Sequence, residues 1–306
     1  MITENIIISH DFSWLDIERP FKSDSAFIAE EFQLPPVLMM TCMKPEQLPK
    51  YEKISNGYFF LLRIYDPWNS SDDITIHTMS NKLAIFISES NVLTIHNNMI
   101  FPLKKYIDMK DDFGLPKDSR RLTHQLISLC ILSYEEALYD IQEIYEGFEK
   151  EILSGDKAGG ILSNKRVYEF RRRLFVLKGL IQMTQRSIYT SAGFWKDCHE
   201  LQQDIRENLD QLYFRLEGLS QNFDQLFALH LSINDRKNNE VMKVLTLFAS
   251  VMLPLTFISS FYGMNFDFLP GTHSREGLVG AVLIMFTITF MTIWFFARKD
   301  WFKQSV

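Results

Sequence analysis

The sequence predicts an α+β domain that folds in water in α/β/α layers, followed by long stalk helices and a two-helix transmembrane hairpin at the C-terminal end. Three patterns support this fold class. Short runs rich in β-branched and aromatic residues occupy the first part of the chain, apolar residues at helical spacing follow, and two long uncharged blocks come last. We therefore expect three domains in the 306 residues: 1–118, 119–240 and 241–306.

The first domain contains six short stretches with the composition of β-strands. Polar turn residues separate them, and the last four follow one another closely, which predicts a largely antiparallel sheet with helices before and after it. One such helix is expected at Ser23–Phe32 and should stop at Pro35-Pro36. The expected strands are Asn5–Ser9, Trp14–Ile17, Tyr58–Tyr65, Asp73–Met79, Lys82–Ser88 and Val92–His96.

The sequence of this domain lacks the motifs of common enzymes. It has no glycine-rich phosphate loop and no Gly-x-Ser-x-Gly elbow. His10, His77 and His96 are scattered, so we expect them to be solvated or hydrogen-bonded side chains. We therefore predict no enzymatic activity and no bound cofactor.

Charge and cysteine content narrow the partners and the compartment. The net charge of −6 and the lack of a basic domain argue against a nucleic-acid partner. Cys42, Cys130 and Cys198 have no paired spacing, which predicts neither a disulfide framework nor a zinc site and suits a reducing compartment. The first residues lack a basic region before an apolar run, so no cleaved signal peptide is expected.

From about Ser119 onward, apolar residues recur at three- and four-residue steps, which predicts long helices. Acidic residues between Glu135 and Glu149 form the opposite face of the first helix. This face is either solvated or attracts divalent cations near the inner mouth of a channel. A second helix is expected at Ser163–Tyr189, and its Arg171–Arg173 run should pair with acidic neighbours such as those of the first helix.

A third helix is expected to run from about residue 196 to Gly263, because no proline interrupts the pattern before Pro254. At ~1.5 Å per residue it would be ~100 Å long. Such a helix cannot bury its apolar stripe alone. It must therefore bundle with the preceding helices and with copies of itself.

Two blocks near the C-terminal end, Val244–Tyr262 and Gly277–Ala297, contain no charged residue. The first has about 19 residues, enough at ~1.5 Å per residue to cross most of a ~30 Å hydrocarbon core. The connecting segment Gly263–Glu276 is too short for a domain. The blocks therefore predict a helical hairpin that crosses the bilayer twice.

The charges around this hairpin predict its orientation. The connecting segment carries only one lysine or arginine, Arg275, beside the acidic Asp267 and Glu276. The positive-inside rule therefore predicts that both chain ends lie in the cytoplasm and the loop outside, and Trp294 and Trp301 suit the inner interface. The basic residues that flank the hairpin are Arg236, Lys237, Lys243, Arg298, Lys299 and Lys303.

The tetrapeptide Tyr262-Gly263-Met264-Asn265, at the outer end of the first span, resembles the CorA family of divalent-cation channels. The runs Asn239–Thr246 and Leu253–Phe257 are also similar to this family, and the close match covers roughly the last quarter of the chain. The resemblance implies a homopentamer in a bacterial inner membrane, with stalk helices forming a funnel and the first span lining the pore. It also implies inward passage of magnesium, with cobalt and nickel as further cargo.

A stripe of residues on the first span steps by three or four and therefore lies along one helix face. Periodicity alone is compatible with helix packing or with a pore lining. The resemblance favours the pore lining, with Gly263, Met264 and Asn265 as the selectivity filter and with Met242 and Leu245 as an apolar constriction that gates by dewetting. The stripe consists of Asn239, Met242, Leu245, Ala249, Leu253 and Thr256.

The first span contains no aspartate or glutamate, which suits a hydrated cargo. Magnesium gives up its water reluctantly, so a pore of amides, hydroxyls and carbonyls can select the hydrated ion by hydrogen-bonding to its shell. Asn265 and Thr256 are expected to bind the metal in this way, through coordinated waters. Asp267 and Glu276 would supply negative charge at the outer mouth.

The outer loop departs from the family pattern. Members selective for magnesium often carry Met-Pro-Glu-Leu, whereas Leu269–Thr272 has no glutamate. This difference leaves cobalt, nickel or zinc open. The alternatives are a zinc transporter, which would share the Gly-Met-Asn triplet, and a membrane-anchored helical scaffold that conducts no ion.

Overall fold

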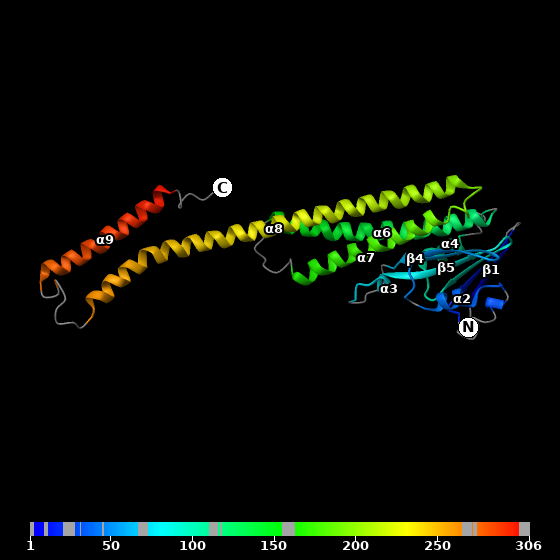
Figure 1. Ribbon diagram of the computed structural model, residues 1–306, viewed down its shortest axis with the longest axis horizontal. Coiled ribbons are helices and arrows are strands. Elements are labelled where there is room, and N and C mark those ends of the chain that lie inside the picture. Colours follow the sequence, from blue (N-terminus) through cyan, green and yellow to red (C-terminus); the bar gives the residue numbers. More distant parts are fainter. Residues whose placement is uncertain are drawn as a thin grey trace. The chain divides into compact units, whose positions relative to one another are not determined.

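The computed structural model describes residues 3–8, 12–20, 28–30, 32–44, 46–66, 73–109, 116, 118–154, 163–264, 271 and 274–299. The chain divides into two compact units, Met1–Leu226 and Phe227–Val306. The long helix α8, His199–Tyr262, begins in the first unit and ends in the second (Figure 1). The two units are described separately.

The first unit is built on one six-stranded sheet with the order β1-β2-β6-β5-β4-β3. Strands β2 and β6 are parallel, so that Asp16 lies opposite Thr94, and all other neighbours are antiparallel. The largely antiparallel sheet predicted from the sequence is therefore confirmed. The strands are β1 Thr3–Ile8, β2 Ser13–Glu18, β3 Lys50–Ile54, β4 Gly57–Tyr65, β5 Ser80–Ile87 and β6 Asn91–His96.

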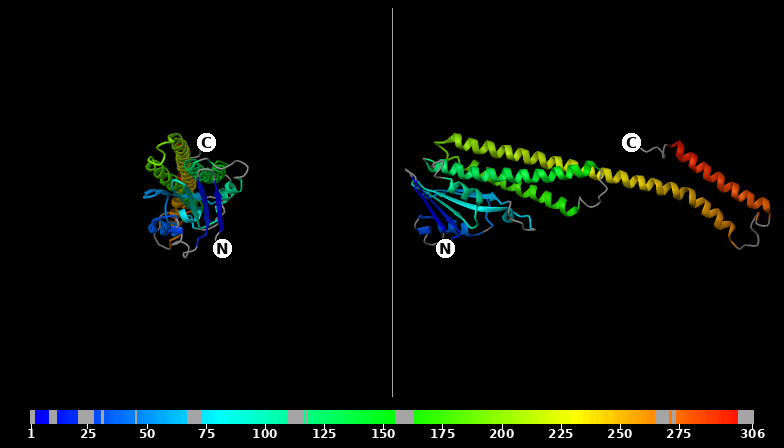
Figure 2. Two further views of the ribbon diagram at one scale, coloured as in Figure 1. Left: turned by 90° about the vertical axis from the view of Figure 1, so that its right-hand side faces the viewer. Right: turned by 180° about the vertical axis from the view of Figure 1, so that it is seen from behind.

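Side chains alternate between the two faces of the sheet, and each face packs against helices. On one face, Phe59 packs in a core with residues of α2, Pro36–Met43. On the other, the ring of Phe60 lies 5.4 Å from that of Phe194. The helices α4, Phe101–Asp108, and α6, Ser119–Ser154, lie on this second side (Figure 2). The predicted α/β/α layers are thus confirmed.

Helix α6 is attached directly to the backbone of β4. The Tyr134 hydroxyl donates to the carbonyl oxygen of Arg63 at 2.7 Å, and the backbone N–H of Tyr65 donates to the Ser133 hydroxyl at 2.9 Å. These four groups are buried in the centre of the unit. The contact anchors the helical layer to the sheet.

Four short elements differ from the sequence prediction. Asp73–Met79 was predicted as a strand, but Ile76–Met79 forms the helix α3. Its Thr75 and Thr78 side chains bond to each other's backbone N–H groups, a capping box that outweighs the strand-like alternation. Strand β3 and helices α2 and α4 were not predicted.

Helix α2 begins at Pro36, where the sequence predicted only a helix stop. Proline is tolerated in the first helical turn because its missing N–H has no partner there anyway. Of the helix predicted at Ser23–Phe32, the described residues Ile28–Glu30 are helical and Phe32 lies in a turn. The rest of that prediction, and Ser9 of the first predicted strand, lie outside the described residues.

The helix α7, Asn164–Thr190, lies beside α6 and the first part of α8. Its arginines pair with both neighbouring helices. Arg166 lies 3.3 Å from Glu151 of α6, whereas Arg171 lies 2.9 Å from Asp224 of α8. The prediction that Arg171 pairs with an acidic neighbour is correct, but that neighbour belongs to the following helix.

In the second unit, the described residues form the end of α8 and the helix α9, Arg275–Arg298. The Ser274 hydroxyl caps α9 by accepting a hydrogen bond from the N–H of Gly277 at 3.1 Å. Among the described residues of this unit, Ala281 is the only buried apolar one. The described part of the unit therefore forms no apolar core in a single chain.

Candidate ion-conduction site

The residues predicted to line the pore all lie on the continuous helix α8. Met242, Leu245 and Leu253 are 58%, 59% and 70% exposed, so these three side chains are not covered by any of the residues that the structure describes. Val244 and Phe248, on other faces, are equally exposed. The whole segment must therefore be covered by lipid or by other chains. The exposed fractions alone do not show that the stripe, rather than another face of the helix, lines a pore.

Hydroxyl groups along α8 differ in their hydrogen bonding. The hydroxyl of Thr246 donates to the carbonyl oxygen of Met242 at 2.8 Å, and that of Ser250 donates to Thr246 at 2.7 Å. Such bonds to the preceding turn are the usual way for a helix in lipid to satisfy a hydroxyl. The Thr256 hydroxyl has no partner among the described residues, so it remains available to a water molecule.

The predicted filter begins where α8 ends. The N–H of Gly263 donates to the Ser259 carbonyl at 2.9 Å, and that of Met264 donates to Phe261 at 3.4 Å. A Cβ on Gly263 would lie 3.2 Å from the Ser259 oxygen, closer than side chains normally come. The φ of Gly263 is not positive, so this close packing, and not a left-handed backbone, favours glycine here.

The outer mouth is described in part. Asn265, Asp267 and the other residues up to Pro270 lie outside the described residues. Glu276 lies in the first turn of α9, where its negative charge also favours the helix N-terminus. Gly271, which stands where the family pattern has glutamate, has a φ of 92°. This left-handed backbone favours glycine.

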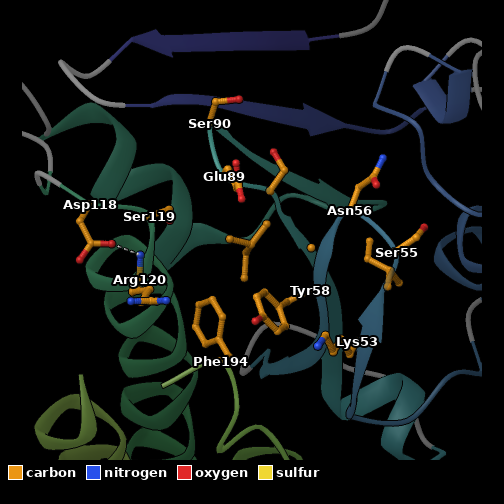
Figure 3. A pocket seen from close by; sticks show the side chains of 14 residues that line it. Lys53, Ser55, Asn56, Tyr58, Glu89, Ser90, Asp118, Ser119, Arg120 and Phe194 are labelled. Atoms are coloured by element: carbon orange, nitrogen blue, oxygen red, sulfur yellow. Dashed lines mark hydrogen bonds between the residues drawn. The ribbon is translucent and has the colours of Figure 1, made fainter. Parts of the chain in front are cut away.

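An open hollow of the first unit lies at one end of the sheet. It is an open groove of about 760 Å³ between two strand turns and the beginning of α6 (Figure 3). Lys53 and Glu89 lie on opposite sides of it, and Arg120 is held by Asp197 at 2.9 Å. Opposite charges balance around the groove, which gives no preference for an anion or a cation.

Sequence reasoning did not foresee a buried ion pair in the first unit. His96 is 4% exposed, with one ring nitrogen 2.7 Å from the Asn98 carbonyl oxygen and the other 3.3 Å from a carboxylate oxygen of Asp16. Both nitrogens face acceptors, an arrangement that favours the ring with a proton on each nitrogen. Burial opposes this charge, but the hydrogen bond and charge of Asp16 outweigh it and raise the pKa of His96.

A second buried cation is satisfied by backbone alone. The Lys82 ammonium donates to the carbonyl oxygens of Thr41 and Lys44, at 3.2 and 2.6 Å, and so caps the C-terminal end of α2. Burial lowers the pKa of Lys82 to about 8. Within the described ranges, no three His, Cys, Asp or Glu side chains are arranged to hold a metal ion. On the acidic face of α6, Glu135, Glu136, Glu143 and Glu146 are exposed in the single chain, and whether this face attracts cations stays a prediction.

The two units together define a class of protein. Helices α8 and α9 are each long and apolar enough to cross a membrane, and their apolar windows are 0% and 6% buried, unlike the core helix of a soluble protein. An α/β domain attached to such a pair is a membrane protein with two C-terminal spans.

The chain belongs to the CorA family, because the family model described as "CorA-like Mg2+ transporter protein" matches residues 9–298. The cobalt/magnesium transport protein CorA of Thermotoga maritima is 24% identical over 299 residues, which cover 94% of this chain and 83% of that protein. Members of this family are membrane transporters and not enzymes. The resemblance seen in the sequence, and the prediction that the chain is no enzyme, are therefore confirmed.

Solved structures show the same fold. The complete CorA magnesium transporter of Methanocaldococcus jannaschii matches with a TM-score of 0.78 at 18% identity, over 98% of each chain. The ZntB cytoplasmic domain of Vibrio parahaemolyticus matches with a TM-score of 0.61 at 12% identity, over 78% of this chain and 98% of that one. At these identities the matches establish the fold and leave the transported cation open.

Proposed function

We propose that this chain is one subunit of a homopentameric channel that passes hydrated divalent cations, chiefly magnesium, into the cell. Cobalt and nickel would be further cargo. The pore is lined by α8, and the channel lies in the inner membrane with both chain ends in the cytoplasm. The observation that carries this proposal is the uncovered, acid-free end of α8, which leads through the unbonded Thr256 hydroxyl to Gly263 and Met264.

The proposed pore selects a cation that keeps its water. Removing that water from magnesium would require well-placed carboxylates, and α8 has none from Val244 to Tyr262. Rings of Thr256 hydroxyls and Asn265 amides can instead accept or donate hydrogen bonds to the coordinated waters. Asp267 and Glu276 raise the local concentration of cations at the mouth.

The gate of the proposed channel is apolar. Met242 and Leu245 are one turn apart on α8, and their side chains are not packed within the chain. In a symmetric assembly they form two adjacent rings around the axis. A narrow apolar constriction expels water and stops a hydrated ion without any plug. Asn239 and Ala249 flank it on either side.

The parts of the chain divide the work in this proposal. Residues 1–118 form the cytosolic α/β/α domain, 119–240 the helical stalk, and 241–306 the spans, loop and basic tail. The names of the relatives support the cargo: the Salmonella typhimurium relative, 25% identical over 58% of this chain, is a magnesium transport protein. A zinc transporter coupled to protons is disfavoured, because neither span contains a carboxylate or histidine to relay a proton.

The test is cation uptake into proteoliposomes that contain the full-length protein. Magnesium, cobalt and zinc are offered separately, with a membrane potential and with or without a pH gradient. We expect magnesium uptake that follows the potential and falls to background in Asn265→Ala. The control is Asn222→Ala, the same change on the exposed surface of α8 in the first unit, which should transport as the wild type does.

Each other outcome selects an alternative. Zinc uptake that follows the pH gradient, without magnesium uptake, would identify a zinc transporter. If the folded protein takes up no cation, the remaining alternative is the membrane-anchored helical scaffold that conducts no ion. Full magnesium uptake by Asn265→Ala would contradict the proposed role of Asn265 in the selectivity filter.

A further inference from the structure

Three hydroxyls lie close together at the outer end of α8 and differ in their bonding from those earlier in the helix. The hydroxyls of Thr256, Ser259 and Ser260 have no partner among the described residues. Earlier in the same helix, Thr246 and Ser250 bond to the preceding turn. The change in bonding therefore coincides with the last two turns before the predicted filter.

The second span behaves differently. The hydroxyls of Thr287, Thr289 and Thr292 in α9 all donate to the carbonyl oxygen four residues before them, at 2.8 Å. A helix surrounded by lipid must satisfy its hydroxyls internally, because an unbonded hydroxyl in an apolar medium costs free energy. The unbonded hydroxyls of α8 therefore need water or a polar neighbour, which lipid does not provide.

Helical periodicity separates the two serines. Ser260 follows Thr256 by four residues and Leu253 by seven, so it continues the stripe predicted to line the pore. Ser259 lies about 100° further round the helix, at 3.6 residues per turn. Both serines are exposed in the chain, so only their direction distinguishes them.

Gly263 fixes the end of this face. It lies one turn beyond Ser260, and the Cβ that it lacks would contact the carbonyl oxygens of Ser259 and Ser260 at 3.2 and 3.6 Å. The turn that carries both serines is therefore packed closely against the first residue of the filter. A hydroxyl on this turn is held by the backbone at a constant distance from the filter.

We propose that Ser260 is a further pore-lining residue that forms a second ring of hydroxyls between Thr256 and the filter. This inference rests on the proposed channel function. The Ser260 ring lies about 6 Å beyond the Thr256 ring, at ~1.5 Å per residue. A hydrated divalent cation that leaves the filter passes from one ring to the next, and its coordinated waters hydrogen-bond to each in turn.

The first test compares uptake of magnesium by Ser260→Ala and Ser259→Ala in proteoliposomes. The two variants lose the same atom from adjacent residues on different faces. We expect Ser260→Ala to lose about 3- to 10-fold in uptake rate, as for one hydrogen bond lost to the passing ion, and Ser259→Ala to stay within about twofold of the wild type. Ser260→Thr keeps the hydroxyl and should restore most of the rate.

Equal rates for the two alanine variants, with an active wild type, would overturn the role of Ser260 and leave the channel function intact. A wild type that transports no divalent cation would instead overturn the proposed function. The two failures are thus distinguishable in one set of measurements.

The second test is independent of transport. Ser260→Cys and Ser259→Cys are made with Cys198 replaced by serine, while Cys42 and Cys130 stay, because both are buried and burial raises the pKa of each thiol to about 12. A cationic thiosulfonate is then added to each full-length variant in vesicles. It should modify the Ser260→Cys variant at least about 10-fold faster than the Ser259→Cys variant. Equal or reversed rates would overturn the inference.

Discussion

The two units of the chain place the same side chains in opposite surroundings. Phe59, Phe60 and Phe86 in the first unit are at most 3% exposed, whereas Phe257 and Phe286 in the second are 71% and 70% exposed. In water, burial of such rings drives folding. The exposed rings of the second unit are stable only in a different solvent, the bilayer, or against other chains. Residue type therefore does not determine burial here.

The two units also differ in whether their polar groups find hydrogen-bond partners within the chain. In the first unit, even the buried charges of His96 and Lys82 have hydrogen-bond partners within the chain. In the second, Thr256 has none among the described residues. The buried charges of the first unit are thus satisfied within the chain, whereas the Thr256 hydroxyl needs water or a polar neighbour from outside it. This difference agrees with the proposed pore, which lies in the second unit.

The largest expected effect contrasts two phenylalanines. Phe59→Ala empties a fully buried position and should lower the unfolding free energy of the first unit by about 3–5 kcal/mol. Phe257→Ala removes an exposed ring and should leave that free energy unchanged. Denaturant unfolding of the full-length protein in detergent, followed by tryptophan fluorescence, measures both. Equal destabilisation by the two variants would show that the units fold as one.

A smaller effect concerns pH. The pKa of His96 is raised in the folded chain, so its contribution to stability is fully present below about 6.5, the ordinary value for histidine, and is lost as pH rises through the folded pKa. Stability of the wild type relative to His96→Gln should therefore fall as pH rises above about 6.5. Unfolding midpoints of both proteins from pH 5 to 9 measure this. A constant difference over that range would contradict the charged pair with Asp16.

The smallest effect is expected at the surface. Arg171 and Asp224 join α7 to α8, but their side chains are 50% and 62% exposed, so solvent screens the pair. A double-mutant cycle with Arg171→Ala and Asp224→Ala should give a coupling energy below about 1 kcal/mol, and it should decrease with added salt. A coupling of several kcal/mol that salt does not change would show that the helices depend on this contact.

Elements were predicted correctly from the sequence where a residue pattern had only one physical explanation. The uncharged blocks, the long α8 and the strands Tyr58–Tyr65 and Val92–His96 are all present. The prediction failed at Asp73–Met79, where side-chain capping by Thr75 and Thr78 outweighed an alternating pattern. Pro36 was likewise misread, because the same residue can end one helix and begin the next. In the site, periodicity gives the stripe on α8 and also places Ser260 on it and Ser259 off it, although the stripe predicted from the sequence ended at Thr256.

By itself, the sequence determined the membrane spans, the acid-free character of the first span and the CorA resemblance, because these depend on composition and on residues close together in the chain. The tertiary structure decided which groups share a buried site and which hydroxyls remain unbonded. Asp16 and His96 are far apart in sequence and meet only because β2 and β6 run in parallel. Such contacts depend on the pairing of distant segments, and local patterns do not encode that pairing.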